Sequence, residues 1–468
     1  MEKVIQSKNQ FSQLITNSIN EDSMMGVISK IQKAHQVQAS WEKTELSQRC
    51  EYITKIIEQI ELNKNQIAQS ESVEQGLTID FQLRKNILPL TDYAKQIIDK
   101  VQSEIEATNG QLPTGLTLIM TTWQLQFRMI GERLLPALLA GNVVLVKVSS
   151  QSIGSGLFWQ QILSRAGVPD NVVQFLYFQS DELLKILSGH PGIKAISFVG
   201  QNSTAKKIAS AALPSMKKLQ FSLGTKTSAL ILSVDRIDQW ISDLAESIMM
   251  GSGQLAWNVH RIYVLDQHRD LVIEKLKAIW NQYGPLTDEN QNLGYSPLIN
   301  QDSIAQYQSY LQTIRQESGK LVIQSVESFD HSSSMNREVI ESELLRESTN
   351  NHSCFCSPVI VLDLPNCSEL QQEELHLPIV LMTSVKYPYE MVKWINNNHY
   401  GHHCVIYGDY EKIIKFGQQC EVGHVMGNSW LHYLKPISGQ KASAYGLQDF
   451  RWNGDFYSKA KSFLIKSF

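Results

Sequence analysis

Apolar residues in the first hundred positions recur at intervals of three and four, which is the spacing of one face of an α-helix. Ile28, Ile31 and Ala34 follow this spacing, and so does the run from Tyr52 to Ile60. Gly and Pro, which break helices, are almost absent from the same stretch. The pattern therefore predicts helices from residue 22 to about residue 105.

From residue 116 onward, short apolar runs alternate with amphipathic stretches. The apolar runs that are typical of buried strands are Leu116–Met120, Val143–Val146, Val172–Tyr177 and Ala195–Val199. The stretches that favour helices are Leu134–Leu139, Ser155–Ala166, Ser180–Leu187 and Thr204–Ala212. Regular alternation of strand and helix predicts a parallel sheet with helices on both faces.

The alternation restarts after residue 226, which indicates a second α/β domain. Its first expected elements are strands at Ala229–Leu232 and Ile262–Leu265 and helices at Ile237–Met250 and Leu271–Tyr283. Residues 316 to 355 are rich in Ser, Glu and Asn, and we expect surface loops there. The stretch from Asp455 to Leu464 has the aromatic and apolar content of an edge strand.

Composition excludes several classes of protein. Hydrophobic residues make up 43% and charged residues 19% of the 468 residues, a normal balance for a globular chain of two or three domains. The net charge is −4 and no basic run stands out, which argues against nucleic-acid binding. No stretch approaches the roughly 20 apolar residues that span a bilayer, and the N-terminus lacks an apolar run of signal-peptide kind. We therefore expect a cytoplasmic protein without a membrane partner.

The six cysteines are scattered through the chain, which favours reduced thiols over a disulfide framework. Cys354 and Cys356 form a C-x-C pair that is too close for the usual zinc spacing and has no partner pair. We expect no metal site.

A turn at residues 198–203 and a lysine at position 147 are candidates for phosphate binding. Gly200 follows a buried strand and permits a tight turn, and the helix that begins after it presents free backbone N–H groups. Lys147 follows another strand, at the sheet edge where ligands of open α/β sheets bind. Each signal also fits a purely structural crossover turn or a solvated lysine.

The order and spacing of many longer segments resemble the aldehyde dehydrogenase superfamily. The resemblance covers nearly the whole chain from about residue 28, and many collinear segments are more specific than one glycine motif. The segments are Pro136–Ser150, Ala166–Leu176, His190–Ala209, Phe221–Lys226, Gly251–Val264, Glu373–Val380, Asn396–Gly401, Val422–Trp430 and Pro436–Gly446.

The resemblance implies an α/β fold of three parts. A Rossmann-like cofactor-binding domain would comprise residues 1–104 and 119–225, and a catalytic-type α/β domain residues 226–430. A small β oligomerisation element would comprise residues 105–118 and the C-terminal tail 431–468. We accordingly expect a homodimer or a higher homo-oligomer, or a hetero-oligomer with an active homologue.

The residues that match the family's catalytic positions depart from what its chemistry requires. The position of the nucleophilic cysteine is Ala256, and a methyl group cannot attack an aldehyde. The position of the glutamate base is Ser222, whose hydroxyl cannot serve as a base near neutral pH. The oxyanion-holding asparagine corresponds to Gln124, which moves the amide outward by about a C–C bond, ~1.5 Å.

The positions that match the cofactor site are altered less evenly. Trp123, Lys147 and Glu374 are retained, with Glu374 matching the glutamate that holds the nicotinamide ribose. The family's phenylalanine two residues later is His376, and the carboxylate that holds the adenine-side ribose is Ser150.

Gly200 and Gln201 fall in the family's phosphate-binding turn, and its second glycine is Ala205, which could crowd a diphosphate. The loss of the carboxylate at Ser150 means that NADP is not disfavoured relative to NAD, if either binds.

Three functions follow from these departures. A non-catalytic homologue with a scaffolding, regulatory or ligand-binding role accounts best for a pseudoenzyme without a nucleophile. An NAD(P)-dependent oxidoreductase acting on aldehydes by thiol-independent chemistry, using His260 or His376, is an alternative, although both histidines also fit packed or surface positions. The other alternative is an engineered variant of an active enzyme, and it would also have to explain Ser222.

Overall fold

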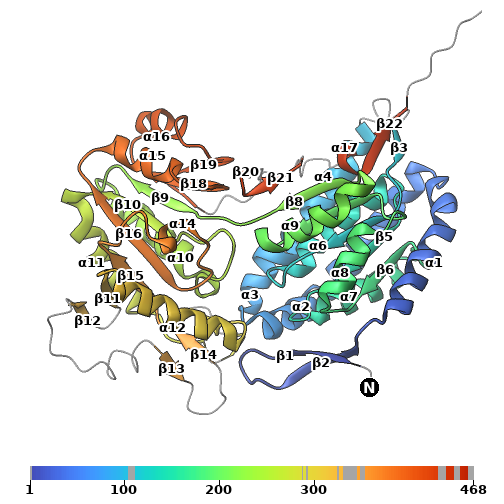
Figure 1. The fold of residues 1–468 in the computed structure, drawn as a ribbon, viewed down its shortest axis with the longest axis horizontal. Helices are drawn as coiled ribbons and strands as arrows, with labels where there is room; N and C mark the ends of the chain where they lie inside the picture. Colours follow the sequence, from blue (N-terminus) through green and yellow to red (C-terminus); the bar gives the residue numbers. More distant parts are fainter. Residues whose placement is uncertain are drawn as a thin grey trace, which may run out of the picture.

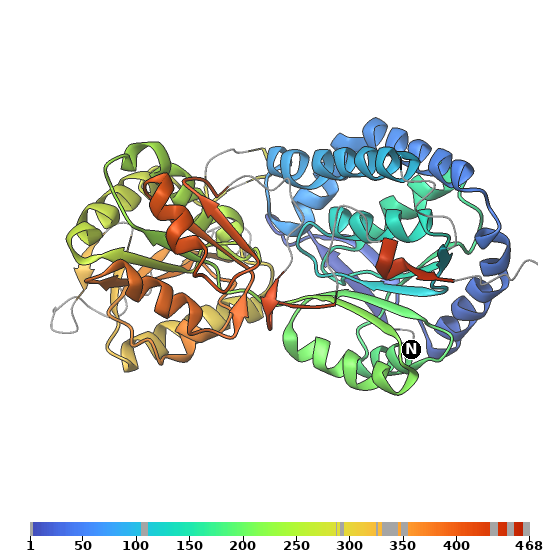
Figure 2. The same cartoon turned by 90° about the horizontal axis from the view of Figure 1, so that it is seen from above.

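The chain folds into two α/β lobes that lie side by side, with the backbone crossing between them where strand β8 leads into strand β9 (Figures 1 and 2). The computed structural model describes residues 3–103, 111–286, 288–290, 294–323, 326–329, 345–347, 354–430, 439–446 and 454–461. Among these residues, none of the helices is long and apolar enough to cross a membrane.

The helical periodicity of the first hundred residues is confirmed. The helices there are α1 (Met24–Glu42), α2 (Leu46–Gln75), α3 (Ile79–Phe81), the π-helix η1 (Gln82–Ile87) and α4 (Leu88–Ser103). Helix α1 begins after Ser23, whose Oγ accepts a hydrogen bond of 3.1 Å from the N–H of Gly26 and so satisfies a donor of the first turn. Helix α2 ends at Gly76, whose φ of +70° is left-handed and suits glycine.

The first lobe is built on a six-stranded sheet in the order β21–β8–β7–β4–β5–β6. The strands are β4 (Thr117–Met120), β5 (Val144–Lys147), β6 (Val173–Leu176), β7 (Ala195–Val199), β8 (Lys218–Ser222) and β21 (Ala444–Tyr445). Strand β21 is antiparallel to β8, and the other pairs are parallel. Runs of β-branched and aliphatic residues, such as the fully buried Val144, Leu145 and Val146, suit a sheet covered on both faces.

The helices of this lobe confirm the predicted alternation, although their ends differ by a few residues and the first is longer than expected. They are α6 (Gln126–Leu139), α7 (Ile153–Arg165), α8 (Asp181–Gly189), α9 (Asn202–Ala212) and the 3-10 helix η2 (Leu213–Ser215).

The second lobe is built on an eight-stranded sheet in the order β12–β11–β15–β16–β10–β9–β18–β19. Its strands are β9 (Ser228–Ile231), β10 (Arg261–Leu265), β11 (Lys320–Ile323), β12 (Val326–Phe329), β15 (Val359–Leu362), β16 (Ile379–Val385), β18 (His403–Tyr407) and β19 (His424–Gly427). Its helices are α10 (Ile237–Met249), η3 (Met250–Gly253), η4 (Asp266–His268), α11 (Arg269–Trp280), α12 (Gln301–Gln316), α14 (Glu369–Gln372), α15 (Pro388–Asn396) and α16 (Tyr410–Gly417). The predicted second α/β unit is therefore confirmed.

Small two-stranded sheets complete the fold. They are β1 (Val4–Lys8) with β2 (Ile15–Asn20), β3 (Gln111–Pro113) with β22 (Ser458–Ala460), β13 (Leu345–Glu347) with β14 (Cys354–Cys356), and β17 (Tyr400–Gly401) with β20 (Gln440–Lys441). The hairpin of β1 and β2 was not expected from the sequence.

Two local expectations need correction. The described part of residues 316–355 is not loop throughout, because β11 pairs with β12 and β15 at one edge of the large sheet. The expected strand at 455–464 is shorter, since α17 (Gly454–Tyr457) precedes β22 and residues 462–464 lie outside the described residues.

The pairing of β3 with β22 joins the two segments that we assigned to the oligomerisation element. That element is described only at residues 111–118, 439–446 and 454–461, and its expected limit at residue 118 falls inside β4.

Candidate functional site

The position that matches the family's nucleophile lies just after a tight turn between α10 and β10. Gly251 and Ser252 have left-handed backbones, with φ of +57° and +54°. A Cβ atom at Gly253 would lie 2.3 Å from the carbonyl oxygen of Leu377, so a side chain there would displace the turn. The turn leads to Ala256, which is half-buried and which the resemblance matches to the nucleophile position.

Gln124, from the loop between β4 and α6, reaches across the lobes to this turn. The backbone N–H of Ala256 donates to Oε1 of Gln124 at 3.1 Å. The Nε2 atom of Gln124 donates to the carbonyl oxygen of Gln254 at 2.6 Å. Both the backbone donor and the side-chain amide are thus engaged inside the protein, and neither points to a site where an oxyanion could form.

Ser222 ends β8, and its carbonyl oxygen accepts a hydrogen bond of 3.1 Å from the N–H of Gly200. Its Oγ accepts a hydrogen bond of 3.5 Å from Nη2 of Arg133, a buried guanidinium on α6. Burial lowers the pKa of Arg133, yet arginine remains a cation in proteins. A hydroxyl that accepts from a cation is not a general base near neutral pH. Sequence reasoning missed Arg133, because 89 positions separate it from Ser222.

Glu374, which follows α14, contacts the backbone that crosses between the lobes. Its Oε1 accepts a hydrogen bond of 2.8 Å from the N–H of Thr225 and lies 3.1 Å from Nε2 of His376. Burial opposes ionisation of Glu374, but the charge of His376 and its hydrogen bond outweigh burial and lower the pKa of the carboxyl. Glu374 is therefore a carboxylate with two partners from its own chain.

The two histidines proposed for thiol-independent chemistry are both committed to the protein. His260 is 3% exposed, its Nδ1 lies 3.2 Å from the carbonyl oxygen of Ile379, and burial lowers its pKa to about 3. His376 has a left-handed backbone, with φ of +46°, and forms the ion pair with Glu374. Neither geometry favours a histidine that exchanges protons with a substrate.

Lys147 is the last residue of β5, at the carboxyl edge of the first sheet. Its ammonium lies 5.6 Å from the centre of the Phe178 ring, and burial lowers its pKa to about 8. No carboxylate of the described residues lies within 4.0 Å of this ammonium. A cation held without a carboxylate partner suits an anionic ligand.

The other cofactor positions lie on the same edge of the first lobe. Ser150 is half-buried in the turn after β5, and Trp123 is half-buried between β4 and α6. Gly200 follows β7, and a Cβ atom there would lie 2.5 Å from the ring of Phe198.

The first residues of helix α9 complete this edge. Gln201 stands at the N-cap of α9, is exposed, and makes no capping hydrogen bond with its side chain. Ala205 is 3% exposed and belongs to the hydrophobic core, so its methyl group points into the lobe.

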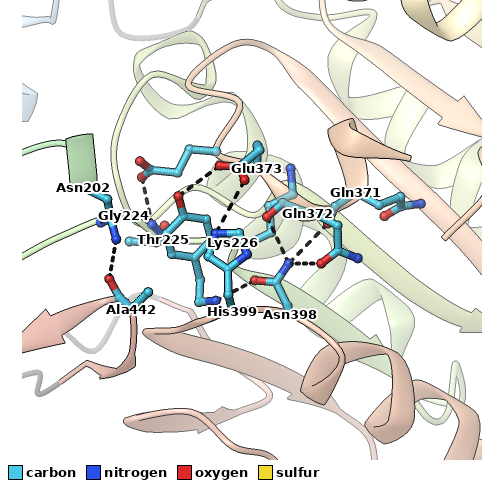
Figure 3. Close-up of polar contacts among 12 residues, drawn as sticks. Asn202, Gly224, Thr225, Lys226, Gln371, Gln372, Glu373, Asn398, His399 and Ala442 are labelled. Carbon is cyan, nitrogen blue, oxygen red and sulfur yellow. Dashed lines mark hydrogen bonds and ion pairs between the residues drawn. The ribbon is translucent and has the colours of Figure 1, made fainter. Parts of the chain in front are cut away.

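Asn202 ties the start of α9 to the backbone that crosses between the lobes. Its Oδ1 accepts a hydrogen bond of 2.9 Å from the N–H of Gly224, and its Nδ2 donates to the carbonyl oxygen of Ala442 at 2.8 Å. Figure 3 shows Asn202, Gly224 and Thr225 in a row, with Ala442 below Asn202. The structure thus brings the turn at residues 198–203, the crossing backbone and Glu374 together.

This architecture, a doubly wound parallel sheet joined to a second α/β lobe, is the fold class of the dinucleotide-dependent dehydrogenases. The model of the aldehyde dehydrogenase family matches residues 1–463, and the chain therefore belongs to the aldehyde dehydrogenase family.

Curated relatives resemble the chain over most of their length. The 2-aminomuconic semialdehyde dehydrogenase of Mus musculus is 23% identical over 456 residues, which cover 93% of this chain and 90% of the relative. The aldehyde dehydrogenase (NAD(P)+) 2 of Saccharomyces cerevisiae is 24% identical over 445 residues, covering 90% and 84%.

Solved structures share the fold. An aldehyde dehydrogenase from Bartonella henselae superposes with a TM-score of 0.86 at 19% identity and covers 98% of this chain and 95% of its own. An NAD+ complex of an aldehyde dehydrogenase from Bacillus cereus gives a TM-score of 0.86 at 19% identity, covering 98% and 92%.

The family implies a dinucleotide, and the residues fit its two ends differently. Lys147 offers a cation at the first lobe that has no carboxylate partner among the described residues. Glu374, in contrast, already accepts from Thr225 and pairs with His376 through the same oxygen, Oε1, so this oxygen is not poised for a ribose. The residues on the nicotinamide side do not fit a dinucleotide.

Proposed function

We propose that this chain is a non-catalytic member of the aldehyde dehydrogenase family that serves as a scaffold, a regulatory subunit or a ligand-binding protein. The observation that carries the proposal is that the side chain of Gln124 forms hydrogen bonds with the backbone at Ala256 and Gln254. A methyl group occupies the nucleophile position, and the N–H beside it is consumed by Gln124 at 3.1 Å. Aldehyde oxidation by the family's route needs a thiolate and a free oxyanion donor.

The position of Ser222 supports the same proposal. Hydrolysis of a thioester needs a base that polarises water, and the hydroxyl of Ser222 accepts instead from the guanidinium of Arg133 at 3.5 Å. Three separate functions, those of nucleophile, oxyanion donor and base, are therefore replaced by contacts that stabilise the fold. An engineered loss of activity would need only one of these changes.

An NAD(P)-dependent oxidoreductase that works without a thiol is the second candidate. It would require a proton donor or acceptor that reaches a substrate. His260 is buried with a pKa of about 3, and His376 is bound to Glu374, which disfavours this candidate.

The proposal includes a cytoplasmic location and assembly as a homo-oligomer, or with an active homologue. The free cysteines among the described residues, Cys50, Cys356, Cys367, Cys404 and Cys420, accord with a reducing compartment. The two-stranded sheet of β3 and β22 offers strand edges for pairing with another subunit. Light scattering of the purified chain, alone and mixed with an active family member, tests the assembly.

An activity assay of the unaltered chain tests the central proposal. The purified protein is incubated with NAD+ or NADP+ and a panel of aliphatic, aromatic and semialdehyde substrates, and formation of reduced coenzyme is followed by absorbance. An active family member measured in parallel controls for reagents. We expect no turnover above the rate without protein, and substrate-dependent turnover by this chain would contradict the proposal.

A further inference from the structure

The contacts of Glu374 form a continuous link between the lobes. Asn202 of α9 accepts from the N–H of Gly224 at 2.9 Å, and the next residue, Thr225, donates its N–H to Glu374 at 2.8 Å. His376 completes the link with an ion pair of 3.1 Å to the same carboxylate oxygen. The first turn of α9 and the carboxylate of the second lobe are therefore joined through two successive peptide N–H groups.

Gly224 and the ring of Tyr400 lie close together beside Glu374. A Cβ atom at Gly224 would lie 2.7 Å from Oε2 of Glu374 and 2.5 Å from Cε1 of Tyr400. The hydroxyl of Tyr400 donates to Oε2 of Glu373 at 3.2 Å, which holds the ring against the crossing backbone. The second carboxylate oxygen of Glu374 and the ring of Tyr400 thus both lie against Gly224.

The charges around the carboxylate of Glu374 favour its ion pair with His376. Burial lowers the pKa of His376, but the carboxylate of Glu374 and its hydrogen bond outweigh burial, so the pKa of His376 is raised. Glu374 and His376 are 14% and 31% exposed at their side chains, so solvent screens the pair only in part. A ribose hydroxyl would have to replace a charged partner with a neutral one.

We propose that the ion pair of His376 with Glu374 closes the nicotinamide-ribose position, so that the nicotinamide riboside half of a dinucleotide adds no affinity for this chain. The inference rests on the proposed function and deepens it, because it assigns a residue to the control of ligand binding. The side chain of His376 then occupies the carboxylate oxygen that a nicotinamide ribose would need. The resemblance implies a phenylalanine at position 376, and a phenylalanine cannot pair with a carboxylate.

Isothermal titration with NAD+ and with ADP tests whether the ion pair of His376 with Glu374 closes this position. The measured quantity is the ratio of the two dissociation constants, in the full chain and in His376→Phe and His376→Asn. Asn tolerates the left-handed backbone at this position, which covers the case in which Phe fails to fold. Thermal unfolding reports whether each variant is folded. His399→Asn is the matched control, because it removes a histidine that lies 3.6 Å from the neighbouring carboxylate of Glu373.

For the full chain we expect NAD+ and ADP to bind equally within about threefold, or neither to bind. A folded His376 variant should prefer NAD+ by about tenfold or more, since a hydrogen bond to a charged group is then available to the ribose. His399→Asn should leave the ratio unchanged.

Three results would overturn the inference. The first is a parent chain that prefers NAD+ over ADP by more than about tenfold. The second is a folded His376 variant that binds neither ligand or whose ratio of dissociation constants equals that of the parent. The third is a change of this ratio in His399→Asn as large as in the His376 variants. Aldehyde turnover by the parent would contradict the proposed function, whereas an unchanged ratio in folded variants contradicts only this inference.

Discussion

Shortening Gln124 in a chain that carries Ala256→Cys tests whether Gln124 blocks the donors around residue 256. A thiolate at this position can attack an activated ester such as p-nitrophenyl acetate. Sulfur bonds to the carbonyl carbon, the carbonyl oxygen becomes negative, and p-nitrophenolate leaves with the electron pair of the broken C–O bond. The reaction needs the nucleophile and the oxyanion donors but no dinucleotide, so it reports on this part of the site alone.

The expected effect follows from the two hydrogen bonds of Gln124. A negative oxygen reaches the N–H of residue 256 only after the bonds of 3.1 Å and 2.6 Å have broken. Two such bonds contribute about 1–3 kcal/mol together, or roughly 5- to 150-fold in rate. If the amide cannot move aside, a whole donor is lost, which costs about 2.7–4 kcal/mol, or 10²–10³-fold.

Asparagine at position 124 is shorter by about one C–C bond, ~1.5 Å, and cannot hold both contacts. We therefore expect Ala256→Cys with Gln124→Asn to release p-nitrophenolate about 100-fold faster than Ala256→Cys alone. Stopped-flow absorbance measures the first turnover. The parent chain gives the background of other thiols such as the exposed Cys367, and Gln267→Asn in the Ala256→Cys chain is the matched control at an exposed site. Equal burst rates within about threefold, in folded proteins, would refute the blocking role of Gln124.

Two further predictions concern buried ionisable groups. Burial raises the pKa of Glu71 from 4.5 to about 7, so the folded state favours the protonated acid and loses stability as pH rises through that range. Glu71→Gln should therefore be more stable than the parent at pH 8, by at most about 3 kcal/mol, and no more stable at pH 4, as measured by urea unfolding. Lys147→Met should weaken ADP binding about tenfold and remove its decline above pH 8, since burial lowers the pKa of Lys147 to about 8 and an anion favours the charged form. Isothermal titration at pH 7 and pH 9 checks this, with the exposed Lys185→Met as control.

Opposite outcomes would contradict the reasoning in each case. A Glu71→Gln chain that is less stable than the parent at pH 8 would mean that the network around Glu71 needs the ionised form. That network includes Asn86, whose Nδ2 donates to Glu71 at 2.9 Å. An ADP affinity that is the same in Lys147→Met as in the parent would exclude Lys147 from the ligand site.

Local patterns predicted most elements because the periodicity that marks a helix or a strand involves residues only a few positions apart. The hairpin of β1 and β2 shows the limit of this reasoning. Ser7 points inward on β1, where an apolar residue would be expected, and its hydroxyl donates to the buried carboxylate of Glu74. Glu74 also accepts from Asn17 on β2 at 2.7 Å, so a distant carboxylate on α2 holds both strands.

The candidate site, too, was predicted from the sequence only in part. Ala256 is visible in the sequence, and only the resemblance implies that it stands at the nucleophile position. The sequence also indicated that the amide of Gln124 is displaced, but not that it occupies the backbone donor beside Ala256. The pairing of His376 with Glu374 spans only two positions, yet its effect depends on Thr225, which is 149 positions away.

The sequence by itself determined the order of most helices and strands and the family, and it is the basis of the proposal that nucleophile and base are missing. Only the tertiary structure decided which polar groups meet, because Gln124 and Ala256 are 132 positions apart and come together where the two lobes touch. Periodicity reports which side of a helix or strand faces the core. It carries no information on which donor of one lobe satisfies which acceptor of the other, and the proposed closure of this site rests on those contacts.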